Sequence, residues 1–140
     1  MKVFFDNCTP PVLATTLHGF VQKDGHAAYH IKDVPGLPRG RNSADVEWIE
    51  LLKKSSERWI FISGDRRLLK NAAERAALRS AGLHGFILAP GYQKTELHHV
   101  ASLLIWRWPE LLKITELVAP PAMYEIPMQR GSKLRPVSLR

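Results

Sequence analysis

The chain has almost no cysteine and no long hydrophobic run, and each absence narrows the class of protein. A single cysteine, Cys8, excludes an internal disulfide and is typical of a reducing compartment. No apolar run approaches the roughly 18 residues that cross a bilayer. The first residues also lack the pattern of a signal peptide. We therefore expect a cytoplasmic protein with no membrane partner.

Two common chemical motifs are missing as well. The sequence has no Gly-rich loop followed by Lys and Ser or Thr, which argues against a nucleoside triphosphatase. His98 and His99 are adjacent and would point about 100° apart on a helix, so they do not form the four-residue pair of a helical zinc site. Cys8 has no His or Asn placed to support a catalytic thiol. Zinc and thiol chemistry are therefore the less favoured hypotheses.

The charge balance favours a polyanionic partner. The 140 residues include 20 Lys and Arg against 13 Asp and Glu, a net charge of +7, which is suited to RNA or DNA. The alternative is a basic surface without a specialised partner. A length of 140 residues fits one domain with one hydrophobic core. We place this domain at residues 1–118. Residues 119–140 are interpreted as a basic, Pro-rich C-terminal extension that contacts RNA or a protein partner.

The pattern of apolar segments predicts an α/β fold. Strands are expected at residues 2–6, 26–31, 59–63 and 84–88, with helices at 10–20, 44–54, 66–81 and 94–108 and a short one from Pro109 to Leu117. Residues 124–126 are expected to form a short edge strand. This alternation predicts a small central, mostly parallel sheet between helices.

Two aspartates follow predicted strands. Asp6 ends the first strand and Asp65 comes just after the third. The carboxyl ends of parallel strands border the crevice where open α/β sheets bind ligands. Carboxylates that converge there repel each other unless a hard cation such as Mg²⁺ neutralises them. The alternative for each aspartate is a turn or capping role.

A third acid, Asp45, begins the helix between them. Trp48, Ile49 and Leu52 lie three, four and seven residues further on, so Asp45 shares their buried face. It is therefore either a ligand that points into the cleft or a residue that caps the helix. Glu47 lies roughly 200° around the helix from Asp45 and is a second-choice metal ligand.

Four further residues are candidates for support of this site. Ser63 is two residues before Asp65 and could orient a carboxylate. Asn7 could be a neutral metal ligand or a hydrogen-bond donor to one of the ligands, with a turn role as the alternative. Arg66 and Arg67 begin the next helix and are candidates for phosphate contact, with a solvated surface as the alternative.

These segments resemble the PIN-like ribonucleases, in particular the VapC-type toxins of bacterial toxin–antitoxin pairs. The matching pieces are Val3-Phe4-Phe5-Asp6-Asn7, Ser43-Ala44-Asp45-Val46-Glu47-Trp48 and Ile62-Ser63-Gly64-Asp65. The resemblance implies a three-layer α/β/α domain that binds Mg²⁺ or Mn²⁺ through Asp6, Asp45 and Asp65 and cleaves single-stranded RNA. It also implies a cognate antitoxin as partner, and a homodimer is compatible with it.

One departure from the family pattern leaves alternatives open. PIN nucleases usually have a fourth acid soon after the third, whereas the next acid after Asp65 is Glu74. The expected activity is a Mg²⁺-dependent endoribonuclease toxin. The first alternative is a weak or inactive PIN-like module that binds RNA or protein. The second is a phospho-receiver-like domain, which would use Lys94 beside the acids.

Overall fold

The computed structural model describes all 140 residues and contains one six-stranded sheet. The strand order is β2-β1-β3-β4-β5-β6. The first five strands are parallel, and β6 runs antiparallel to β5. The strands are β1 (Lys2–Phe5), β2 (Ala27–His30), β3 (Trp59–Ser63), β4 (His84–Leu88), β5 (Ala122–Ile126) and β6 (Arg135–Val137).

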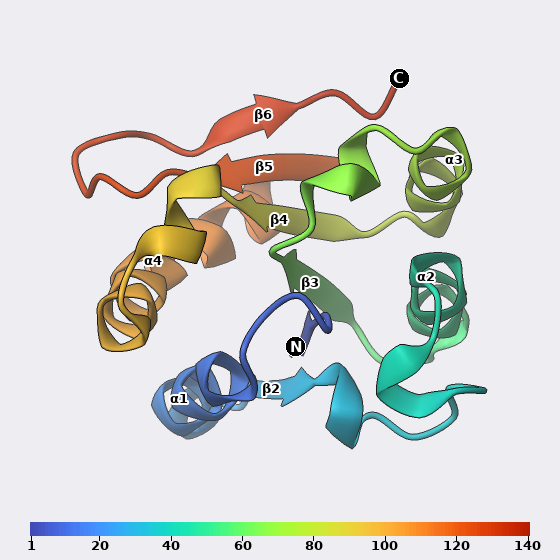
Figure 1. Ribbon diagram of the computed structural model, residues 1–140, viewed down its shortest axis with the longest axis horizontal. Helices are drawn as coiled ribbons and strands as arrows, with labels where there is room; N and C mark the ends of the chain where they lie inside the picture. Colours follow the sequence, from blue (N-terminus) through green and yellow to red (C-terminus); the bar gives the residue numbers. More distant parts are fainter.

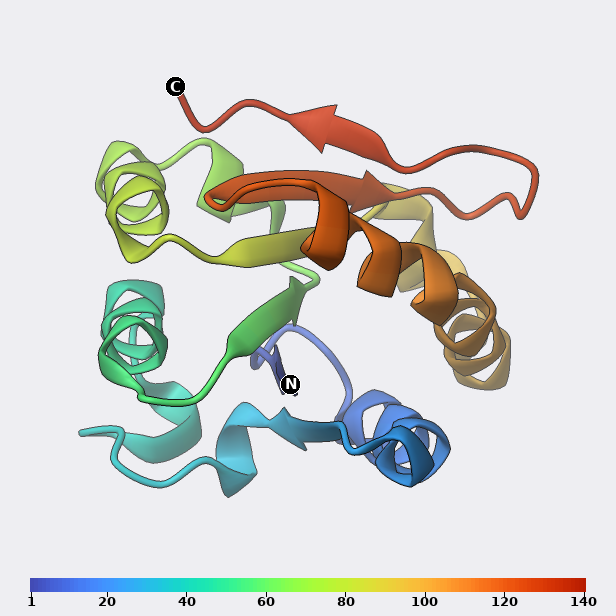
Figure 2. The same ribbon diagram turned by 180° about the vertical axis from the view of Figure 1, so that it is seen from behind.

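Four α-helices cover the two faces of this sheet, as Figure 1 shows. The helices are α1 (Pro11–Val21), α2 (Asp45–Lys54), α3 (Ala72–Ala81) and α4 (Leu97–Leu117). Helices α1 and α4 lie on one face and α2 and α3 on the other, an arrangement also seen from behind in Figure 2. The expected three-layer α/β/α fold is therefore confirmed. None of the helices combines the length and apolar character that crossing a membrane requires.

A separate hydrophobic core fills each side of the sheet. Side chains of successive strand residues alternate between the faces, so Val3 and Phe5 join the core under α1 and α4, whereas Phe4 joins the other. On that second side the Phe4 ring stacks on Trp48 of α2, with 4.7 Å between ring centroids. Trp48, Ile49 and Leu52 are all buried, so the helix face that the sequence predicted is confirmed.

Two predicted helices have different limits in the structure. The segment 66–81 divides into a short 3-10 helix, η4 (Arg66–Leu69), and α3, because the side chain of Asn71 accepts a hydrogen bond from the Glu74 N–H and starts a new helix. In contrast, α4 continues through Pro109 as one helix of 21 residues. Leu103 and Leu111 are buried on either side of the proline, and this packing outweighs its cost.

The C-terminal segment is part of the sheet. Strand β5 lies between β4 and β6, so the expected edge strand at residues 124–126 is an interior strand and the true edge is β6. Leu134 and Leu139 are buried, and Glu125 on β5 pairs with Arg135 on β6. The outer strand β6 also contains Pro136, which is exposed. Residues 119–140 therefore include two strands that complete the domain.

Removing residues 128–140 is expected to destabilise the protein strongly. The truncation deletes β6 and the buried side chains of Leu134 and Leu139, and it removes one of the two acceptors of the buried Arg107, the Gln129 carbonyl. These losses amount to roughly 4–8 kcal/mol, comparable with the whole stability of a small domain. Thermal unfolding followed by circular dichroism measures the effect.

Two single variants serve as a matched pair for this truncation. Leu134→Ala should lower the melting temperature clearly, whereas Lys133→Ala, at an exposed neighbour, should leave it unchanged. A truncated protein that melts like the full chain would contradict a structural role for this segment and would restore its interpretation as a free basic arm.

Candidate acidic site at the strand ends

The acids that the sequence singled out lie where the chain reverses direction across the sheet. From β1 the chain crosses to β2 on one side, whereas β3 lies on the other side of β1. Such a switch point is where open α/β sheets bind ligands. Asp6 directly follows β1, and Asp65 follows the neighbouring β3. The sheet therefore places Asp6 and Asp65 beside each other at its carboxyl edge, as their positions in the sequence predicted.

Asp6 is a buried carboxylate with only 2% of its surface exposed. Ser63 donates a short hydrogen bond from its hydroxyl to Asp6 Oδ2, and the Gly64 N–H donates to Oδ1 at 3.4 Å. Burial raises the pKa of Asp6 to about 7, with the hydrogen bonds from Ser63 and Gly64 opposing the rise and the negative charges of Asp45 and Asp65 adding to it. The predicted orienting contact of Ser63 with a carboxylate is thus present, and the carboxylate is Asp6.

Asp65 is held by Arg67. Its Oδ1 accepts hydrogen bonds of 2.9 Å from the backbone N–H and the Nε of Arg67, and its Oδ2 accepts one of 3.0 Å from Nη2. Burial alone would raise the pKa of Asp65, but the contacts with Arg67 outweigh it and hold the pKa below its ordinary value. Asp65 therefore caps η4, which was its alternative role, and also borders the acidic cleft.

Asp45 lies on α2, where its Oδ1 accepts a 2.8 Å hydrogen bond from Trp48 Nε1. The carboxylate of Glu74 on α3 faces it, and Glu74 Oε2 is buried without a hydrogen-bond partner. Burial raises the pKa of Glu74, and the charges of Asp45 and Asp65 contribute to the rise. Glu74 is thus a fourth carboxylate whose charge interacts with those of the aspartates.

Sequence reasoning placed Glu74 two turns into a helix that began at Arg66. Because α3 begins at Ala72 instead, Glu74 lies in its first turn. The pattern Asn71-Ala72-Ala73-Glu74, a capping residue followed three positions later by glutamate, is the signal that could have located it.

Glu47 has another function in this structure. Its Oε1 accepts a 2.7 Å hydrogen bond from the Ala44 N–H at the start of α2 and one of 2.7 Å from Arg39 Nη2. Contact with Arg39 is the main reason that the pKa of Glu47 lies below its ordinary value. The second-choice ligand is therefore committed to capping α2, and its charge is not among those that act on Asp6.

Cationic side chains flank the acids on two sides. Arg41 donates from Nε to Asn7 Oδ1 at 3.0 Å, next to Asp6. On the other side Arg66 pairs with the buried Glu125 at 2.5 Å, and Arg67 holds Asp65. Asn7 is thus a hydrogen-bond acceptor for Arg41 here. The arrangement places guanidinium groups on both sides of the carboxylates, where they can contact the phosphates of a bound strand.

The donor set fits a hard divalent cation. Oxygen ligands from carboxylates suit Mg²⁺, and the mutual repulsion that contributes to the raised pKa values of Asp6 and Glu74 is the charge excess that such an ion relieves. No three of these side chains stand together at metal-coordinating distances. Mg²⁺ commonly keeps several water ligands and uses only one or two protein carboxylates, so an ion at this site would contact some of the acids through water.

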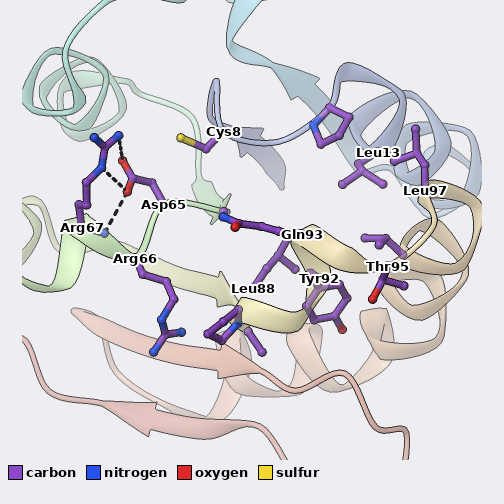
Figure 3. Close-up of a pocket in the computed structure, with 15 residues that line it drawn as sticks. Cys8, Leu13, Asp65, Arg66, Arg67, Leu88, Tyr92, Gln93, Thr95 and Leu97 are labelled. Atoms are coloured by element: carbon purple, nitrogen blue, oxygen red, sulfur yellow. Dashed lines mark hydrogen bonds and ion pairs between the residues drawn. The ribbon is translucent and has the colours of Figure 1, made fainter.

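A cavity of about 720 Å³ opens beside the acids, and Figure 3 shows its lining residues. Asp65, Arg66 and Arg67 lie on one side of it, and apolar residues of α1 and α4 form the far wall. Cys8 also lines it. Burial raises the pKa of the Cys8 thiol to about 11, with the charge of Asp6 adding to the rise, so the thiol is protonated at neutral pH. A thiolate nucleophile is therefore not available in this cleft.

These observations define an α/β domain with a carboxylate site at the switch point of a parallel sheet and arginines at its margins. Comparison with known families then assigns the chain. The family described as PIN like domain matches residues 1–90 of the 140. The chain belongs to this family, whose members are typically nucleases. No curated protein and no solved structure gave a significant match.

Proposed function

We propose that the protein is a Mg²⁺-dependent endoribonuclease that hydrolyses RNA phosphodiester bonds at the carboxylate site. The observation that carries this proposal is the set of four carboxylates whose charges act on one another near the ends of β1 and β3: Asp6, Asp45, Asp65 and Glu74. A buried carboxylate whose pKa rises to about 7 is costly to keep charged, and this is a common mark of a functional site.

The metal would be held by Asp6, Asp45 and Asp65, in part through its water ligands, with Glu74 as the fourth acid and Mn²⁺ as a substitute ion. When bound, it supplies an activated water and stabilises charge on the scissile phosphate. The protein's own contribution is orientation. Ser63 fixes the Asp6 carboxylate and the Trp48 indole fixes that of Asp45, so two acids keep one direction in the cleft.

The arginines are proposed to bind the RNA backbone. Arg41 and Arg66 lie on opposite sides of the acids, and both already donate to a protein oxygen, so their guanidinium groups are oriented before substrate arrives. Their contact with phosphate would offset the repulsion between RNA and the carboxylates. The net charge of +7 supports the same class of partner.

Cleavage measured on two acid variants tests the site. Asp45→Asn and Glu74→Gln should lower Mg²⁺-dependent cleavage of single-stranded RNA by at least about a hundredfold and tenfold respectively, because each removes a carboxylate from the group. Glu47→Gln is the matched control, an acid on α2 that faces Arg39 instead of the cleft, and it should retain near-normal cleavage. Normal cleavage by both Asp45→Asn and Glu74→Gln would sink the assignment, and so would a loss of cleavage confined to the Glu47→Gln control.

We further propose that this nuclease is the toxin of a toxin–antitoxin pair, neutralised in the cytoplasm by a cognate antitoxin. The resemblance of the three acidic segments to VapC-type toxins motivates this step. Induced expression in a bacterial host should stop growth, and the Asp45→Asn variant should not. Normal growth under expression of an active nuclease would argue against a toxin.

The second candidate is a PIN-like module that binds RNA or protein without cleavage. The contact that favours it is the ion pair between Arg67 and Asp65. Arg67 donates to both carboxylate oxygens of Asp65, which a metal ion would otherwise use. Titration calorimetry with Mn²⁺ separates the two functions. Binding at micromolar to millimolar Mn²⁺ supports the nuclease, whereas RNA binding without any metal binding supports the module.

A further inference from the structure

The cavity beside the acids has the composition of a pocket for an uncharged, flat group. Its inner walls are apolar and come from three parts of the chain: Leu13 of α1, Leu88 and Tyr92 at and after the end of β4, and Leu97 and Val100 of α4. A volume of about 720 Å³ is in the range of pockets that enclose a ligand of nucleotide size. Because the cavity includes Asp65, it is continuous with the acidic site.

The charged residues of this cavity are confined to one side of it, here called its mouth. Asp65, Arg66 and Arg67 lie together on the side of the acidic site in Figure 3, and Asp65 is the only acid in the lining. A nucleotide has the same division between a charged phosphate and an uncharged base. With the phosphate at the mouth near the arginines, the adjoining base would enter the apolar interior.

One polar side chain of the cavity lining is free to select a base. Gln93 extends from the short 3-10 helix η5 (Pro90–Lys94) toward the Cys8 and Asp65 side of the cavity in Figure 3, and its exposed side chain makes no hydrogen bond within the protein. The hydroxyls nearby are already used, since Tyr92 donates to the Pro127 carbonyl and Thr95 to the Gly91 carbonyl. An amide presents a donor and an acceptor side by side, which is the chemistry that reads a base edge.

We propose that this cavity binds the unstacked base of the nucleotide next to the scissile phosphate, and that Gln93 sets the preference among bases. The inference rests on the proposed function, because that function places the phosphate at the acidic site. Unstacked bases in single-stranded nucleic acid are commonly held against apolar and aromatic side chains, and the ring of Tyr92 is available in this wall.

A binding experiment tests the pocket without any cleavage. The four ribonucleoside 5′-monophosphates are titrated into the ¹⁵N-labelled protein with CaCl₂, and binding is followed through the amide signals of residues around the cavity. Leu97→Trp fills the pocket from a position that is 42% exposed, so the core is not disturbed, and should weaken binding at least tenfold. Leu117→Trp, at the other end of the same helix and 81% exposed, is the control and should bind as the wild type does.

A second measurement tests the role of Gln93. Gln93→Ala should reduce the ratio of affinities between the best-bound and worst-bound monophosphate about fivefold or more, because one base-edge contact supplies discrimination of that order. Gln22→Ala, at an exposed position at the end of α1, should leave the ratio unchanged. An unchanged ratio in Gln93→Ala would overturn the assignment of this residue.

The outcomes separate this inference from the nuclease proposal. If the wild type cleaves RNA with Mg²⁺ but Leu97→Trp binds monophosphates normally, the pocket proposal is overturned and the nuclease stands. If the wild type binds monophosphates in a Leu97→Trp-sensitive manner but cleaves no RNA, the pocket stands and the nuclease is overturned. Signal changes that spread evenly over the surface would also overturn the pocket.

Discussion

Replacing Asp6 with asparagine is expected to raise the melting temperature of the metal-free protein at pH 8 while it abolishes metal-dependent RNA cleavage. The stabilisation follows from the pKa of Asp6, which burial raises from 3.8 to about 7. Between these two values the folded protein retains a proton that the unfolded chain has released. Stability therefore falls as the pH rises from about 4 to 7 and stays low above 7.

The size of this effect can be estimated. The raised pKa corresponds to a cost on the order of 4 kcal/mol above pH 7, and the loss of one acceptor for Ser63 or Gly64 returns about 1 kcal/mol of it. A net gain of roughly 3 kcal/mol should raise the melting temperature by about 5–10 °C. Calorimetry at pH 8 and pH 4 without metal is the measurement, and the gain should largely disappear at pH 4.

Asp65→Asn is the matched comparison, because its pKa is shifted in the opposite direction. The pairing with Arg67 holds the pKa of Asp65 below its ordinary value, so its charge stabilises the fold at neutral pH and this contribution is lost as the pH falls through the folded-state pKa. The variant should therefore melt lower than the wild type at pH 8. Equal melting temperatures for both variants and the wild type would contradict this account of the site.

Replacing Gly85 with alanine is expected to destabilise the protein by about 3 kcal/mol. Gly85 lies in β4, paired with Phe61 of β3 and Met123 of β5. A Cβ atom at this position would stand 2.2 Å from Phe61 Cζ and 2.4 Å from Met123 Sδ, both in the buried core. Neither side chain can move without disturbing its neighbours. Urea unfolding of the purified variant gives the free energy.

Gly19→Ala provides the matched control for this prediction. Gly19 lies inside α1, and a Cβ atom there would meet nothing within 4 Å. Alanine should stabilise the protein by about 0.5–1 kcal/mol, because it favours the helix over the unfolded chain. The double variant Gly85→Ala with Met123→Ala tests the competition between the two side chains. Its loss of unfolding free energy should be smaller than the sum of the losses in the two single variants. Strictly additive effects would show that the two positions do not compete for space.

Most of the fold could be predicted from local patterns in the first 90 residues. The four strands and the buried face of α2 were marked by runs of apolar residues and by the spacing of Trp48, Ile49 and Leu52. Of the last two strands, β5 was predicted only in part, as a short edge strand at residues 124–126, and β6 was not predicted. Strand β5 is held by pairing with β4, and the three residues of β6 are held by β5, so both depend on contacts that are distant in sequence.

The site was predictable to the extent that strand ends determine it. Asp6 and Asp65 come just after strands β1 and β3. They lie close together because these two strands are parallel neighbours in the sheet. The contribution of Glu74 was missed because it depends on where α3 begins, which the capping pattern from Asn71 to Glu74 could have indicated. The ion pair between Arg67 and Asp65 could not be predicted either. An arginine that pairs with the preceding aspartate and one that is solvated at the surface look the same in the sequence.

The outer strand β6 limits how copies of this protein can associate. An exposed strand edge offers N–H and C=O groups to another chain, and proteins commonly block such edges with proline, charge or short length. Strand β6 has three residues and includes the exposed Arg135 and Pro136, so it offers few donors to a further strand. A homodimer with one continuous sheet across both copies is therefore disfavoured at this edge, which also protects the folded protein from edge-to-edge aggregation.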